Sequence, residues 1–167
     1  MTLDELFKDK ALKPKEKTDF LAKGLLEKSL DIETLLLYAQ KGKDAVKATC
    51  IEALEFATKE NPNIATEAVL AFVTQTLTEK APRVKWESAK VVGNIARLFP
   101  TQLDEAVGNL LKNSHHEGTV VRWSAAYALG EILKLRTALN EELLPAVQEI
   151  LEREEKDSIR KIYLKAI

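Results

Sequence analysis

Residues 84–93 read Val-Lys-Trp-Glu-Ser-Ala-Lys-Val-Val-Gly, and residues 121–130 read Val-Arg-Trp-Ser-Ala-Ala-Tyr-Ala-Leu-Gly. Each stretch starts with valine and a basic residue and ends on a glycine. A similar start returns at Val46-Lys47 and Ile159-Arg160, so the four copies follow one another at steps of 38, 37 and 38 residues. A repeat of this length predicts a solenoid, in which each unit buries its apolar face only against its neighbours.

The bulk properties are those of an ordinary globular chain. Its 167 residues are 46% hydrophobic and 31% charged, with a net charge of −1, which suits one domain and gives no global reason to expect nucleic acid. No apolar run approaches the roughly 20 residues of a membrane helix, and the first residues lack the pattern of a secretory signal. The single cysteine, Cys50, cannot form an internal disulfide. We therefore expect a cytoplasmic protein that does not contact membranes.

Helical periodicity runs along almost the whole chain, and strand alternation is absent. We expect a short first helix capped by Thr2, and a second from Pro14 to about residue 29. Asp31 is the expected N-cap of the next helix, to about residue 40. The remaining expected helices span about 44–59, 64–80, 83–98, 102–113, 119–135, 141–155 and 158–167. From residue 64 onward they form pairs, whose first member we name the A helix and whose second member the B helix.

The repeated stretches resemble HEAT repeats, an armadillo-like α-solenoid family. The B helix of that family typically reads Val-Arg, then Ala-Ala and Ala-Leu-Gly, and Leu143-Leu144-Pro145 is similar to its proline-bearing A helix. The resemblance covers about residues 31–167. It implies an all-α, right-handed superhelix of antiparallel helix pairs. We expect capping helices in residues 1–30 and four repeats, at 31–60, 63–99, 101–136 and 140–167, forming one domain.

The resemblance also implies a structural ladder. In HEAT repeats the basic residue after valine commonly ties adjacent repeats together, often through an acidic residue of a turn. The residues at this position are Lys47, Lys85, Arg122 and Arg160. The turns between the A and B helices, at residues 80–82 and 115–118, lack a clear aspartate, which leaves the acidic partner of each rung open.

The position after the ladder residue carries Trp86 and Trp123 in two repeats. Residues four further along lie on the same helix face, which places Lys90 beside Trp86 and Tyr127 beside Trp123. The resemblance puts the B helices on the concave surface, where aromatic and basic residues would bind a partner. The candidate binding residues are Trp86, Lys90, Arg97, Trp123, Tyr127, Lys134, Lys161 and Lys165. The alternative is that both indoles only fill the seam between successive B helices.

The charges are divided between the two kinds of helix. The last three B segments sum to +7 and the matching A segments to −7. A basic inner layer and an acidic outer layer would attract an acidic ligand to the B helices.

The sequence offers little support for catalysis. His115-His116-Glu117 makes a poor metal site because a second ligating group is missing elsewhere, and Cys50 reads as core filler. Di-iron hydroxylases of the HEAT type carry a His-Glu pair after Val-Arg, where this chain has Trp86-Glu87 and Trp123-Ser124. HEAT-like DNA glycosylases use an aspartate that both of these B helices lack. We therefore expect no enzyme activity, with a DNA glycosylase-like enzyme as the weaker alternative, and we expect no metal and no cofactor.

These observations favour a protein-interaction scaffold whose concave B-helix face binds an acidic peptide or helix. Binding of a nucleic-acid backbone in the same basic groove is the alternative. The last helix would expose Ile159, Ile162, Tyr163 and Ile167. We expect this apolar face to pack on the preceding B helix and leave a monomer; self-association or a continuing chain would cover it equally well.

Overall fold

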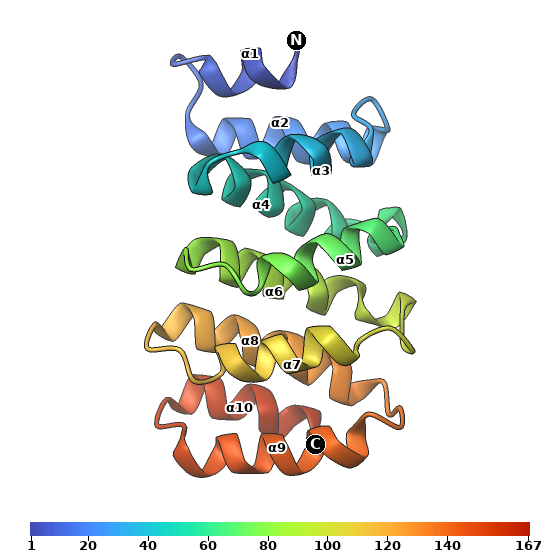
Figure 1. Cartoon of the computed structure of the whole chain (residues 1–167), viewed down its shortest axis with the longest axis vertical. Coiled ribbons are helices and arrows are strands. Elements are labelled where there is room, and N and C mark those ends of the chain that lie inside the picture. Colours follow the sequence, from blue (N-terminus) through green and yellow to red (C-terminus); the bar gives the residue numbers. More distant parts are fainter.

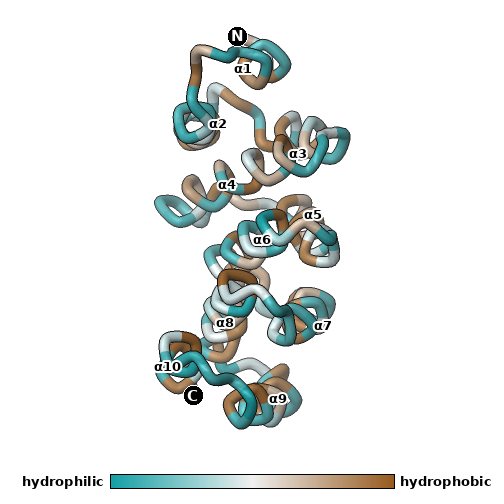
Figure 2. The backbone as a smooth tube through the Cα atoms, turned by 90° about the vertical axis from the view of Figure 1, so that its left-hand side faces the viewer, coloured by the Kyte–Doolittle hydropathy of each residue, from teal (hydrophilic) through white to brown (hydrophobic).

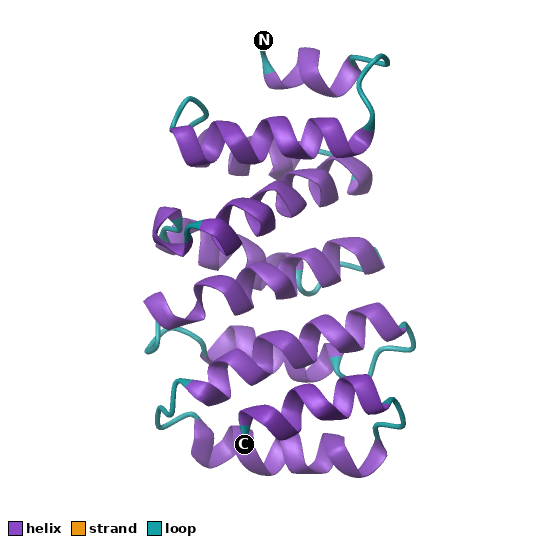
Figure 3. Cartoon of the chain, turned by 180° about the vertical axis from the view of Figure 1, so that it is seen from behind, coloured by secondary structure: helices purple, strands orange, loops and turns teal.

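The computed structural model describes all 167 residues, and it contains α-helices and two short 3-10 helices but no strand (Figures 1 and 3). The elements are α1 (Leu3–Lys8), α2 (Pro14–Glu27), α3 (Ile32–Lys41), α4 (Asp44–Glu60), η1 (Pro62–Ile64), α5 (Glu67–Thr76), α6 (Pro82–Ile95), η2 (Ala96–Leu98), α7 (Asp104–Asn113), α8 (Thr119–Lys134), α9 (Asn140–Arg153) and α10 (Asp157–Ala166).

The helices form two columns, seen end-on in Figure 2. We name α2, α4, α6, α8 and α10 the B column, because each packs directly on the next. We name α3, α5, α7 and α9 the A column. Figure 3 brings the B column to the front, and α1 lies at the N-terminal end of the stack (Figure 1). The arrangement confirms the predicted all-α solenoid, in which neighbouring repeats supply the core.

Local signals start several helices where the sequence predicts them. The hydroxyl of Thr2 accepts the amide of Glu5, and the carboxylate of Asp31 accepts the amide of Thr34. Both contacts satisfy amides that a helix start leaves unpaired. Pro14 and Pro82 occupy first-turn positions, where a missing amide costs nothing.

Two predicted boundaries differ from the structure for local reasons. The expected helix over residues 64–80 is shorter, because η1 intervenes and Thr66 caps α5 by accepting the amide of Val69. The helix expected to reach residue 155 ends at Arg153. Glu154 leaves the helix and pairs with Arg122 instead, so a tertiary ion pair sets this boundary.

The core runs between the columns and through the B column. Three small residues lie at equivalent repeat positions, each four residues after the first valine of its repeat stretch. These residues, Cys50, Ser88 and Ala125, are fully buried where neighbouring helices approach closely. Burial raises the pKa of the Cys50 thiol to about 12, which matches its predicted role as core filler.

The C-terminal helix packs on the preceding B helix. Ile159 and Tyr163 of α10 are fully buried, and Ile162 lies against Gly130 of α8. Leu164 and Ile167 stay exposed. The expected packing on α8 is therefore found for most of this apolar face but not for Ile167. No helix in the chain has the length and apolar character needed to cross a bilayer.

Candidate binding face

A pocket of about 320 Å³ opens where the C-terminal ends of α4, α6 and α8 meet in the B column. We name it the central pocket. Three candidate binding residues, Arg97, Tyr127 and Lys134, line it together. Its full lining is Thr58, Lys59, Pro62, Gly93, Asn94, Arg97, Tyr127, Glu131, Lys134 and Leu135.

Of two stacked aromatic residues on α8, Tyr127 lines this pocket and Trp123, four residues earlier, does not. Trp123 stacks on Tyr127, with ring centroids 6.2 Å apart and planes inclined by 9°. Tyr127 is half-buried over Gly93, whereas Trp123 is 38% exposed. An indole in this state offers apolar area to a partner while its neighbour holds it in place. Trp86, the equivalent residue of α6, is half-buried and does not line the pocket.

A polar network fixes the floor of the central pocket. The hydroxyl of Tyr127 donates to Oδ1 of Asn94 at 2.5 Å. The amide group of Asn94 donates in turn to Oγ1 of Thr58 at 3.1 Å and to the carbonyl of Glu55 at 3.0 Å. The chain of contacts joins α8, α6 and α4. Burial, reinforced by Glu131 and Glu55, raises the pKa of Tyr127 to about 12, so its hydroxyl keeps its proton and remains a donor.

Asn94 is a pocket residue that the sequence pattern did not predict. An amide between Gly93 and Ile95 in a B helix was the available signal, because a side chain of this kind must find partners when it is buried. The partners themselves lie more than thirty residues away on both sides, and no local pattern names them.

The basic candidate residues differ in how free their charges are. Arg97 is exposed and, like Lys59, takes part in no ion pair. Lys134 bonds to Glu131 at 2.9 Å, and Lys90 lies 3.7 Å from Glu87. Two further candidates, Lys161 and Lys165, are exposed on α10 but do not line the pocket. The central pocket therefore carries an excess of positive charge, with unpaired cations from η2 and α4.

An acidic cluster lies between α4 and α6 in the B column. Glu52 and Glu55 of α4 lie near Glu87 of α6, and Glu87 is only 2% exposed. Glu52 accepts a hydrogen bond from Thr18 at 2.8 Å and lies 3.5 Å from Arg83. The predicted basic layer rests on the B segments from residue 83 onward. The helix α4 has more acidic than basic residues, so it does not continue this layer.

The surroundings of Glu87 favour its protonated form. Burial first, and then a hydrogen bond with Glu52, raise the pKa of Glu87 to about 8, although Lys90 acts in the opposite direction. A protonated carboxyl can donate to the Glu52 carboxylate, whereas two charged groups would repel each other. Burial also raises the pKa of Glu55. Both shifts favour a cluster that shares a proton over one in which every carboxyl is ionised.

Stability should accordingly fall with rising pH. A carboxyl with a raised folded-state pKa contributes fully below its unfolded value near 4.5 and loses that contribution as pH rises through about 8. Within this window one such proton gives a slope of up to about 1.4 kcal/mol per pH unit. We expect Glu87→Gln, whose amide can donate to Glu52 at any pH, to flatten the curve. Urea unfolding at pH 5.5, 7 and 8.5 measures it, and parallel curves for the two proteins would refute the shared proton.

The predicted ladder residues lie at the turns between repeats. Lys47 bonds to both carboxylate oxygens of Glu79, at 2.9 and 3.0 Å. Lys85 donates to the carbonyl of Leu77 and to Asn113, an amide in place of an acid. Each residue thus reaches the end of the A helix in the next repeat or the turn beyond it.

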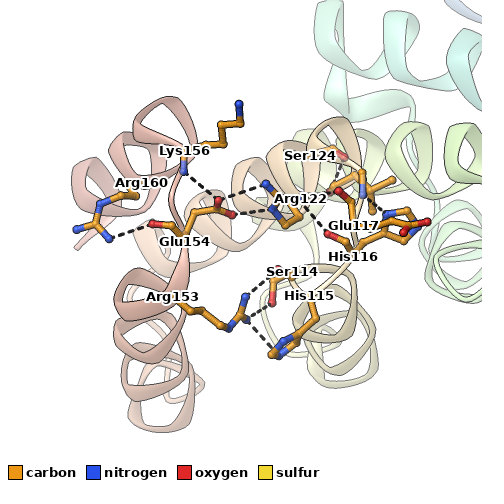
Figure 4. Close-up of polar contacts among 12 residues, drawn as sticks. Ser114, His115, His116, Glu117, Arg122, Ser124, Arg153, Glu154, Lys156 and Arg160 are labelled. Atoms are coloured by element: carbon orange, nitrogen blue, oxygen red, sulfur yellow. Dashed lines mark hydrogen bonds and ion pairs between the residues drawn. The ribbon is translucent and has the colours of Figure 1, made fainter.

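Figure 4 shows the third rung, where Arg122 of α8 meets Glu154 after α9. Nε of Arg122 donates to Glu154 at 2.9 Å, and Nη1 donates to the carbonyls of His116 and Glu117. Burial opposes ionisation of Glu154, but hydrogen bonds from Arg122 and the Lys156 amide hold its pKa below the ordinary value. In the last repeat, Arg160 donates to carbonyls of Leu151 and Glu154.

The two histidines belong to this turn. Nδ1 of His116 accepts the amide of Gly118 at 2.8 Å, and Nε2 of His115 lies 3.1 Å from Arg153 (Figure 4). Arg153 also donates to Ser114. These contacts give both imidazoles a role in holding the turn, and no group of three ligating side chains forms around them.

Comparison with known proteins identifies the fold. No protein family matches the sequence, and no curated protein does so either. A designed armadillo repeat protein in complex with the peptide (KR)4 is similar in structure, with a TM-score of 0.74 and 17% identity over 98% of this chain and 77% of that one. Computationally designed armadillo repeat proteins for modular peptide recognition give a TM-score of 0.76 and 15% identity over 97% and 78%. The fold is thus that of the armadillo and HEAT-like repeat proteins.

Proposed function

We propose that this repeat scaffold is a non-enzymatic protein-interaction module whose B column binds an acidic peptide or helix at the central pocket. Two observations carry the proposal: the exposed indole of Trp123 stacks on Tyr127 of the pocket lining, and the unpaired cations Lys59 and Arg97 belong to the same lining. The indole would bury an apolar side chain of the partner, and the cations would pair with its carboxylates. Lys134 would add a third positive charge, and Lys161 and Lys165 would steer the approach.

The comparisons support the general class of this function. The similar proteins include one that holds a peptide and others designed for peptide recognition. The peptide (KR)4 of the first is basic, whereas the central pocket here is itself positive. Charge complementarity therefore favours an acidic occupant for this chain. We further propose that the protein acts as a monomer in the cytoplasm, since its one thiol is buried and unpaired.

Trp123→Ala should weaken binding of an acidic peptide by at least about fivefold, or about 1 kcal/mol, without unfolding the protein. The probe is a fluorescein-labelled peptide of Glu and Asp carrying two Phe residues, followed by anisotropy. Phe20→Ala on α2 is the matched control, because Phe20 is also an exposed aromatic of the B column but lies far along the stack from the pocket. A large drop in the unfolding midpoint of Trp123→Ala would show that the indole serves the core instead.

Charge reversal tests the polar half of the proposal. Arg97→Glu should weaken binding of the same peptide. Lys112→Glu makes an equal change of charge at an exposed position of α7 and should leave the affinity unchanged. A labelled (Lys-Arg)4 peptide serves as the opposite probe. If this basic peptide binds more tightly than the acidic one, the proposed partner chemistry is wrong.

Nucleic-acid backbone binding through the same pocket is the second candidate, because unpaired cations in the pocket and an exposed indole on the same column also suit phosphates and bases. A mixed-sequence 20-nucleotide DNA strand tests it. Affinity that falls steeply with added salt would favour this function, and the lack of binding at low salt would eliminate it.

A further inference from the structure

A second groove lies on the opposite side of the stack, between the A-column helices α7 and α9. Both helices pack on α8 but not closely on each other, and the space between them measures about 620 Å³. Figure 2 shows the two helices one above the other at the lower end of the A column. Val107, Leu111 and Leu139 contribute apolar side chains to the lining. The groove therefore offers an apolar floor that the fold leaves uncovered.

The rim of this groove is acidic. Asp104 of α7 and Glu141 and Glu142 of α9 all line it and are exposed, and none forms an ion pair. The twelve lining residues include no lysine, arginine or histidine. Carboxylates in the first turns of both helices interact favourably with the helix dipoles. That interaction does not explain why an apolar floor lies between them. Unpaired carboxylates around an apolar floor attract a partner with the opposite charge.

Gly108 leaves this part of α7 without a side chain beside the groove. It lies inside α7, where glycine costs stability relative to alanine. Its backbone is ordinary, since no glycine of the chain has a positive φ, and an added Cβ would meet no atom within 4 Å. Gly93 and Gly130, by contrast, each lie against a neighbouring helix. The structural consequence of glycine at position 108 is free space above the groove floor.

We propose that the groove between α7 and α9 binds a basic amphipathic helix from another protein, with an apolar side chain seated over Gly108 and flanking cations on the acidic rim. Binding by insertion of an apolar helix face into a groove is a common mode of recognition. This site is independent of the central pocket and takes a partner of opposite charge. The two columns would then let one short solenoid join two different partners.

The test uses a labelled 14-residue amphipathic helix of Leu and Lys, with the same peptide carrying Glu for Lys as a control. Gly108→Trp fills the groove and should lower the affinity for the Lys peptide at least about tenfold. Gly108→Ala leaves most of the space free and should stay within about twofold, with a higher unfolding midpoint. Chemical-shift changes in ¹⁵N spectra should concentrate on α7 and α9.

Charge reversal gives a second test that does not depend on how the tryptophan is accommodated. The double change Glu141→Lys and Glu142→Lys should lower the affinity for the Lys peptide at least about tenfold. The matched control, Glu149→Lys with Glu152→Lys, makes the same charge change at exposed positions of α9 outside the groove. Equal losses from both pairs, full binding by Gly108→Trp, or shifts located elsewhere would overturn the proposal.

Discussion

Arg122→Ala should lower the free energy of unfolding by about 3–5 kcal/mol, as expected when one partner of a buried ion pair is removed. The change strands Glu154, whose side chain is only 3% exposed, without its guanidinium. It also leaves the carbonyls of His116 and Glu117 without their donor. One side chain thus holds the third and fourth repeats together at their turns. Urea unfolding followed by circular dichroism measures the loss.

Arg122→Lys and Arg97→Ala make this test specific. A lysine has one compact ammonium group and cannot bond to Glu154 and two carbonyls with the geometry of a guanidinium, so we expect an intermediate loss. Arg97 is an exposed arginine without an ion pair, and its removal should change stability by less than about 0.5 kcal/mol. Equal losses for Arg122→Ala and Arg97→Ala would contradict the structural role of the rung.

Gly93→Ala should destabilise the protein by about 1–3 kcal/mol, although alanine is the better helix former. A Cβ at this position would lie 2.4 Å from Cε2 and 2.7 Å from Cδ2 of Tyr127. The ring would have to move, and its hydrogen bond to Asn94 and its stacking with Trp123 would move with it. The same variant should therefore also weaken binding at the central pocket.

A double-mutant cycle isolates this contact. In a Tyr127→Ala background the clash is absent, so adding Gly93→Ala should become neutral or stabilise by up to about 1 kcal/mol through helix propensity. Calorimetry or urea unfolding of the four proteins gives the coupling energy. If Gly93→Ala is equally harmful with and without the tyrosine ring, some other contact requires the glycine.

The sequence by itself determined the architecture. The buried valines and isoleucine at residues 84, 121 and 159 mark three B helices at nearly equal intervals of 37 and 38 residues. Because the local pattern recurs in each unit, every copy supports the same assignment of helices and turns. The helices, the turns and their stacking could therefore be predicted. The repeat pattern also brought the basic and aromatic residues Arg97, Tyr127 and Lys134 to one face, because Arg97 directly follows α6 and the other two lie on the neighbouring helix α8.

The tertiary structure decided which side chains meet. Glu79, Asn113 and Glu154 are the partners of the ladder residues in three successive repeats, and they differ in residue type and position. The network from Tyr127 through Asn94 to Thr58 crosses three helices. The raised pKa of Glu87 comes first from burial and then from Glu52, thirty-five residues earlier in the chain. A repeat pattern specifies backbone placement because it follows from local periodicity, whereas pairing, burial and protonation depend on atoms that only folding brings within contact distance.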